Sequence, residues 1–248
     1  MINAFSTRRV LLAAVTLLAL GACKGGPDTG VVPGSVADVY EQATRNMRTG
    51  NFRRAIFILE QIQGRFPFSD YGKQAQIDLI YCFYKSGRAE EAVDGADQFM
   101  RENPTHPRVD YALYIKGLTY FDDDPGRFST MLGVDRAERP PSENRQALAT
   151  FKRLVDRYPS SDYAADSVQR MLFLKERLAR YENYVADYYL RRGAYVAALN
   201  RAKNSLEQFN GAEANRRSLE IMIEAYEEMN LPELANDSRR VLEQNRSL

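Results

Sequence analysis

The sequence lacks most of the residues and motifs on which enzymes depend. Its 248 residues include one histidine, two cysteines and no tryptophan. None of the short motifs of a phosphate-binding loop, a zinc protease, a serine hydrolase or a dithiol redox centre occurs. The histidine, His106, stands in Asn-Pro-Thr-His-Pro, a context more typical of a turn than of a general base or metal ligand. We therefore expect a protein that is not an enzyme and that has neither a cofactor nor a metal site.

A surplus of charge of one sign is also missing. The chain carries 34 basic and 33 acidic residues, and two of the basic residues, Arg8 and Arg9, belong to the leader described next. Without them the net charge is about −1. A near-neutral chain has no global field that would attract nucleic acid. We expect no nucleic-acid partner.

A single long apolar run is present, at the N-terminus. It covers residues 10–20 after Arg8 and Arg9, is too short to span a bilayer, and has the flanks of a secretory signal. It ends in Leu-Gly-Ala-Cys, which resembles the lipobox of bacterial lipoproteins, where the cysteine becomes the lipidated N-terminus. The sequence predicts a signal peptide over residues 1–22, with diacylglyceryl and N-acyl lipid on Cys23. The alternative is an ordinary signal peptide in which Cys23 is incidental.

The residues after the cysteine predict a location. Lys24 follows it, whereas lipoproteins held at the inner membrane of Gram-negative bacteria usually carry Asp there. By this resemblance the chain faces the periplasm from the outer membrane. Residues 23–34 are rich in Gly and Pro without an apolar period, which predicts a flexible tether. With Cys23 lipidated, Cys82 has no thiol partner in the chain and is expected to be a small buried apolar residue.

A fixed spacing organises the remaining, roughly 213 residues. Three kinds of position recur 37 residues apart: the turn glycines Gly50 and Gly87, the alanines Ala55 and Ala92, and the prolines Pro67 and Pro104. Tetratricopeptide repeats have this pattern, with small residues where two helices cross and Pro at the end of each unit. The sequence predicts an all-α fold, a right-handed superhelical solenoid of about five tetratricopeptide-like helix pairs.

Two irregularities interrupt the period. In the third unit Gly117 takes the small crossing position, and an insertion over residues 122–142 precedes Ala147, where the pattern resumes. A segment from Tyr163 to Arg192 contains no Gly or Pro and predicts one long helix. We divide the array into repeats 1–3, residues 35–159, and repeats 4–5, residues 160–248.

Positions that the repeat does not need for packing predict a binding surface. In such arrays the first helix of each pair lines the concave side, and counting from the turn glycines places thirteen side chains there: Tyr40, Thr44, Met47, Arg48, Gln74, Ile77, Tyr81, Tyr84, Lys85, Tyr111, Tyr114, Leu118 and Phe121. The loop before the second unit adds Phe66, Phe68 and Tyr71. This lining suits an extended peptide that carries aromatic side chains, with a terminal carboxylate near Arg48 or Lys85. The alternative is that the loop aromatics only pack between repeats.

Several motifs in fixed order resemble one family over essentially the whole chain. They are the Leu-Gly-Ala-Cys motif, Phe52-Arg53-Arg54-Ala55-Ile56, Arg65-Phe66-Pro67-Phe68, Asp78-Leu79-Ile80-Tyr81, Asn103-Pro104-Thr105-His106-Pro107, Asp110-Tyr111, Gly133-Val134-Asp135-Arg136 and Tyr158-Pro159. Together they are similar to the BamD family, lipoproteins of the outer-membrane β-barrel assembly machinery.

The resemblance implies a non-enzymatic adaptor with two binding halves. Repeats 1–3 would bind the C-terminal targeting segment of unfolded outer-membrane proteins through Phe66, where relatives often have Tyr and where stacking survives the loss of the hydroxyl. Repeats 4–5 would bind the last POTRA domain of the barrel subunit BamA through Arg201, by a bidentate ion pair with an acidic side chain. Auxiliary Bam lipoproteins are further expected partners. The second possibility is a repeat lipoprotein that scaffolds cell-wall enzymes or pilus assembly.

Overall fold

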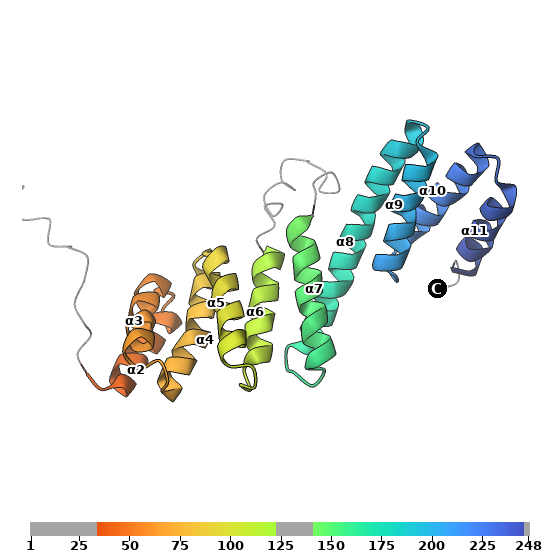
Figure 1. The fold of residues 1–248 in the computed structure, drawn as a ribbon. Coiled ribbons are helices and arrows are strands. Elements are labelled where there is room, and N and C mark those ends of the chain that lie inside the picture. The colour runs from red at the N-terminus through yellow and green to blue at the C-terminus, as the bar shows by residue number, and fades with distance from the viewer. Residues whose placement is uncertain (1–33, 123–140, 246–248) are drawn as a thin grey trace, which may run out of the picture. The chain divides into compact units, whose positions relative to one another are not determined.

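The computed structural model describes residues 34–122 and 141–245, which form ten helices and no strand. The helices are α2 (Val36–Arg48), α3 (Phe52–Arg65), α4 (Asp70–Lys85), α5 (Ala89–Glu102), α6 (Val109–Asp122), α7 (Ser142–Arg157), α8 (Ala164–Arg191), α9 (Tyr195–Gln208), α10 (Asn215–Glu228) and α11 (Pro232–Gln244). Each packs chiefly against the helix before it and the helix after it, so the chain forms five consecutive pairs (Figure 1). The predicted all-α helical array is confirmed over these residues.

The inner turns of the first, second, fourth and fifth pairs use a left-handed backbone. Gly50, Gly87 and Gly193 have φ angles of 75°, 73° and 72°, which glycine adopts without a Cβ penalty. In the last pair Asn230 takes the corresponding place with φ 56°, as asparagine tolerates this region better than most residues. The turn positions predicted from the sequence, Gly50 and Gly87, are therefore confirmed.

Small residues lie where the helices of each pair cross. The five second-helix alanines are fully buried: Ala55, Ala92, Ala147, Ala198 and Ala235. At Gly117 of α6 an added Cβ would lie 2.5 Å from the ring of Phe151 on α7, closer than atoms can approach. The packing of α6 on α7 thus depends on the absence of a side chain at this position.

The long helix is present as predicted. α8 runs without interruption from Ala164 to Arg191 and packs against α7, α9 and α10. Its buried side includes polar residues, among them Glu182 and Asn183.

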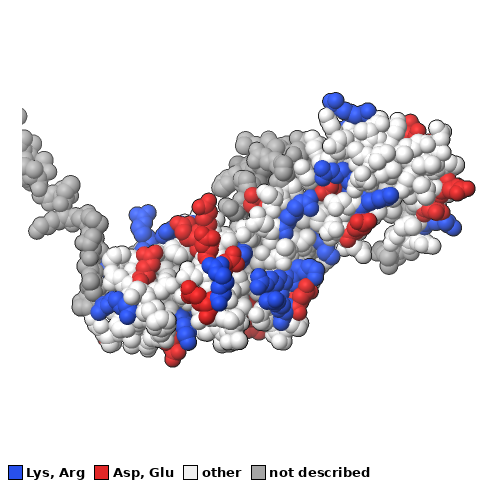
Figure 2. Space-filling model, in the orientation of Figure 1, with Lys and Arg blue, Asp and Glu red and all other residues white. Residues whose placement is uncertain are grey.

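Figure 2 shows acidic and basic side chains interspersed over the visible face, in agreement with the near-neutral composition.

Some expectations lie outside the described residues, namely the signal peptide over 1–22, Cys23, nearly all of the tether, and residues 123–140 of the insertion predicted over 122–142. Within the described part, Cys82 is fully buried as expected. Also within it, no helix combines the length and apolar character that crossing a membrane requires. From Val36 onward the described chain forms one compact unit, and its division into two functional halves at residue 159 stays a prediction.

Candidate functional site

The first candidate site is the aromatic surface, which we define as Tyr40, Arg48, Phe66, Phe68, Tyr71, Gln74, Tyr81 and Tyr84. Two of its members, Tyr40 and Gln74, meet at Asp78, a carboxylate on α4 that the sequence analysis did not select as a site residue. The Tyr40 hydroxyl donates to Asp78 Oδ2 at 2.6 Å, and Gln74 Nε2 donates to Oδ1 at 3.0 Å. The rings of Tyr40 and Tyr71 lie 5.4 Å apart, centroid to centroid. The structure therefore brings Tyr40, Tyr71 and Gln74 together across α2 and α4.

Burial decides the electrostatics of this cluster. It raises the pKa of Asp78, an effect opposed by the hydrogen bonds from Tyr40 and Gln74 and by the positive charge of Arg108. The pKa of Tyr40 is also raised, first by burial and then by its hydrogen bond to Asp78. The Tyr40 hydroxyl therefore stays protonated and is committed to Asp78, which leaves its ring as the group that it can offer to a ligand.

The loop between α3 and α4 presents one aromatic side chain fully to solvent. Phe68 is 92% exposed, while Phe66 and Tyr71 are each 38% exposed. The Ser69 hydroxyl fixes the loop, since it donates to the Phe66 carbonyl at 2.8 Å and accepts from the Gly72 N–H at 2.9 Å. The loop thus has a defined conformation in which Phe68 makes little packing contact.

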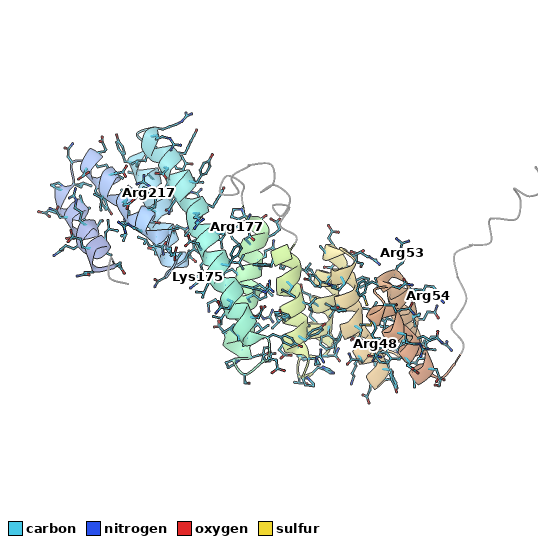
Figure 3. The ribbon with its side chains drawn as sticks, turned by 180° about the vertical axis from the view of Figure 1, so that it is seen from behind. Arg48, Arg53, Arg54, Lys175, Arg177 and Arg217 are labelled. Carbon is cyan, nitrogen blue, oxygen red and sulfur yellow. The ribbon has the colours of Figure 1, made fainter. Side chains whose placement is uncertain are left out.

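The other members of the aromatic surface lie farther along the first helices. Tyr81 and Tyr84 are partly buried against the core, and the ring centroids of Tyr81 and Phe52 lie 6.0 Å apart with nearly perpendicular ring planes. Arg48 is exposed at the end of α2, and Figure 3 shows it in the first helix pair. Tyr40 and Arg48 lie on α2, Tyr71, Gln74, Tyr81 and Tyr84 lie on α4, and Phe66 and Phe68 lie between α3 and α4. The aromatic surface is therefore an extended one.

Two of the residues predicted to line the concave side of the array are buried instead. Ile77 is fully buried and Leu118 is 8% exposed, and both belong to the hydrophobic core formed by α4 to α8. Their prediction as lining residues was wrong because these apolar side chains pack against the neighbouring helices. A hollow of about 110 Å³ lies between α3, α4 and α5, but no member of the aromatic surface lines it.

The aromatic side chains of the third repeat continue onto α8. Tyr163 contacts Tyr111 at 5.5 Å and stacks on Tyr114 at 4.7 Å between ring centroids. The Tyr114 hydroxyl donates to Asp166, which also pairs with Arg170 at 2.6 Å. The sequence analysis missed Tyr163, Asp166 and Arg170. The helical period of α8 was readable, but the insertion before α7 breaks the count that would have aligned α8 with α6.

The second candidate site surrounds Arg201 on α9. Its Nη1 lies 3.1 Å from Glu182 Oε2, and Arg145 Nη2 of α7 lies 2.5 Å from Glu182 Oε1. Glu182 is fully buried, whereas the Arg201 side chain is 42% exposed. Sequence reasoning found Arg201 but neither of the residues grouped with it, because the contacting residues are 19 and 37 positions apart and no short motif joins them.

A comparison with protein families covers both sites. Residues 34–242 match the model of the YfiO family, described as outer membrane lipoprotein. The chain belongs to this family. The YfiO match contains the whole aromatic surface and the Arg201 site, and the family resemblance read from the motifs is confirmed.

Relatives align over nearly the whole chain. The outer membrane protein assembly factor BamD of Neisseria gonorrhoeae is 38% identical, and the alignment covers 96% of this chain and 91% of the relative. The protein of the same name from Vibrio cholerae is 37% identical, with coverage of 96% and 98%. That from Haemophilus influenzae is 35% identical, with coverage of 96% and 90%. This YfiO-family chain therefore matches these relatives along almost their full length.

Proposed function

We propose that this chain is a non-catalytic outer membrane protein assembly factor, held at the outer membrane by lipid on Cys23 and facing the periplasm. The observation that carries the proposal is its identity of 35–38% to relatives of that name along nearly the entire chain. The leader and the Leu-Gly-Ala-Cys motif support the anchor, and Lys24 supports the outer membrane.

Repeats 1–3 bind the C-terminal targeting segment of unfolded outer-membrane proteins in this proposal. The exposed ring of Phe68 and the less exposed Phe66 and Tyr71 offer apolar surface for aromatic side chains of such a segment. Arg48 at the end of α2 supplies a positive charge for a terminal carboxylate. An extended surface fits a peptide better than a compact small molecule.

Repeats 4–5 bind the barrel subunit of the BamA type, with auxiliary Bam lipoproteins as further partners. Arg201 supports this assignment because its guanidinium is partly exposed and has donors beyond the one that faces Glu182. An acidic side chain on a POTRA domain would complete its hydrogen bonding.

A pull-down tests the partner assignment. Tagged full-length lipoprotein is recovered from detergent-solubilised envelopes, and the co-purified barrel subunit is measured. We expect Arg201→Glu to lose the barrel subunit with unchanged helical content, and Arg153→Glu, at an exposed arginine of α7, to retain it. Recovery of intact wild-type lipoprotein without any POTRA-containing barrel protein would overturn the proposed function.

Site-specific photocrosslinking tests the substrate assignment. A crosslinker at Phe68, 92% exposed, is compared with one at Val196, 59% exposed and outside the aromatic surface. We expect the C-terminal segment of a nascent outer-membrane protein to crosslink to position 68 and not to position 196. Equal crosslinking at the two positions would remove the aromatic surface from the proposal.

A variant of the anchor tests the location. Cys23→Ala removes the side chain that would carry the lipid, so we expect the chain to be lost from the outer-membrane fraction. Retention of the variant in the outer-membrane fraction at the wild-type level would contradict lipid anchoring at Cys23.

A further inference from the structure

Glu182, near the middle of α8, is a fully buried carboxylate shared by two arginines. Its Oε1 atom lies 2.5 Å from Arg145 Nη2, and its Oε2 atom lies 3.1 Å from Arg201 Nη1. Arg145 comes from α7 and Arg201 from α9, the helices on either side of α8 in the chain. Because each oxygen of one carboxylate faces one guanidinium, the two arginines are held next to each other.

The side of this cluster that meets solvent is cationic. Two guanidinium groups and one carboxylate leave one positive charge uncompensated within the cluster. The Arg145 and Arg201 side chains are 43% and 42% exposed, while Glu182 is 0% exposed. A buried carboxylate without partners is strongly disfavoured, so Glu182 keeps both arginines at this place.

The geometry leaves donors available for a ligand. A guanidinium has five N–H donors in a planar fork, and each arginine directs one nitrogen at Glu182. The Arg145 guanidinium also lies over the ring of the buried Phe209, 5.6 Å from its centroid, which restrains its plane. Two restrained, partly exposed forks around one buried anion form a preorganised site for a second carboxylate.

We infer that Arg145 and Arg201 act as one two-arginine site for an acidic side chain of the protein partner, and that Glu182 positions both. The inference rests on the proposed function for the existence of that partner. It adds Arg145 to the partner-binding residues, although α7 belongs to the repeats assigned to substrate binding. Glu182 is a positioning residue, because it is buried and touches the partner only through the arginines.

A binding titration tests the two-arginine site. Purified full-length lipoprotein in detergent is titrated with the barrel subunit of the same organism, including its POTRA domains, at low and at moderate salt. We expect Arg145→Ala and Arg201→Ala each to weaken binding about tenfold, the loss of one charge-assisted contact, and to reduce the salt dependence. The double variant is expected to lose less than the product of the two single effects, because both arginines face the same acidic group.

Two further variants separate positioning from charge. Glu182→Gln keeps both cations but removes the anion that holds them, so we expect weaker binding with the salt dependence retained. Arg153→Ala, at an exposed arginine on the same helix as Arg145, is the matched control and is expected to bind like the parent. Each variant is first checked for helical content and thermal midpoint.

The outcomes are distinct. If the parent fails to bind the barrel subunit, the proposed function falls. If the parent binds and Arg201→Ala weakens binding but Arg145→Ala does not, the two-arginine site is wrong and the proposed function stands. If Glu182→Gln binds like the parent, the positioning role is wrong. Should Arg145→Ala disturb the fold, Arg145→Lys replaces it: we expect weaker binding with retained salt dependence, and parental affinity would overturn the contact through the planar fork.

Discussion

Two glycine-to-alanine changes in helix interiors should alter stability in opposite directions. Gly95 lies within α5 and Gly117 within α6. A Cβ at Gly95 would meet Ile80 Cγ1 at 3.4 Å, an ordinary contact, whereas a Cβ at Gly117 would meet three ring atoms of Phe151 at 2.5, 2.8 and 2.9 Å. The gain in backbone entropy is similar at the two positions. The difference in the free energy of unfolding between the two variants therefore measures the steric cost at the crossing of α6 and α7.

The expected magnitudes follow from this geometry. Replacing a helix-interior glycine by alanine gains about 1 kcal/mol from backbone entropy. Gly95→Ala should keep most of that gain. At Gly117 the ring of Phe151 is fully buried and must move by roughly 1 Å, so overpacking should cost about 3 kcal/mol, the upper part of its usual range. The net loss for Gly117→Ala is then about 2 kcal/mol.

Thermal unfolding of the full chain in detergent, followed by circular dichroism, measures both changes. In a chain of this size 1 kcal/mol shifts the midpoint by about 2–4 °C. We therefore expect Gly95→Ala to unfold about 2–4 °C above the parent and Gly117→Ala about 4–8 °C below it. A midpoint for Gly117→Ala equal to or above that of the parent would refute the close crossing of α6 and α7 at this residue.

Three further predictions concern the first two repeats. Gly72→Ala would place its Cβ 2.1 Å from the Phe66 carbonyl oxygen, so urea unfolding should show a loss of about 2 kcal/mol or more, and an unchanged midpoint would contradict the packing of the loop. Burial raises the pKa of Asp78 in the folded chain above its ordinary value of 3.8, so the folded chain binds a proton more tightly than the unfolded chain does. The free energy of unfolding therefore rises as the pH falls from the folded pKa toward 3.8. Asp78→Asn should lose this gain, which urea midpoints measured from pH 7 to pH 4 would reveal as an increasing disadvantage of the variant. Burial and the charge of Asp78 raise the pKa of Cys82 to about 12, so a thiol reagent should label it slowly in the folded chain and rapidly in urea.

The fold was largely predictable because its constraints are local and periodic. A turn that requires a left-handed backbone selects Gly at 50 and 87, and a close helix crossing selects Ala at 55 and 92. Such requirements return at every repeat, so the period exposes them. The surface register was less predictable, because the same count that places Tyr81 on the surface also places Ile77 there, and side-chain burial depends on the neighbouring repeat.

The residues that sequence reasoning missed share a physical cause. Asp78 and Glu182 look like ordinary helix carboxylates in the sequence, and their importance comes from partners on other helices. Tyr40, 38 residues away, donates to Asp78, and Arg145, 37 residues away, pairs with Glu182. No short motif encodes such pairs.

Asp78 and Glu182 both lie beside predicted binding residues. Taking a carboxylate out of water is unfavourable, and the cost is offset only when several donors converge on it. Asp78 therefore restrains Tyr40 and Gln74. Glu182 likewise restrains Arg201 and Arg145. Side chains restrained before binding lose less conformational entropy when a ligand arrives. If the proposed sites bind as we propose, each carboxylate favours binding by fixing the side chains assigned to face the ligand.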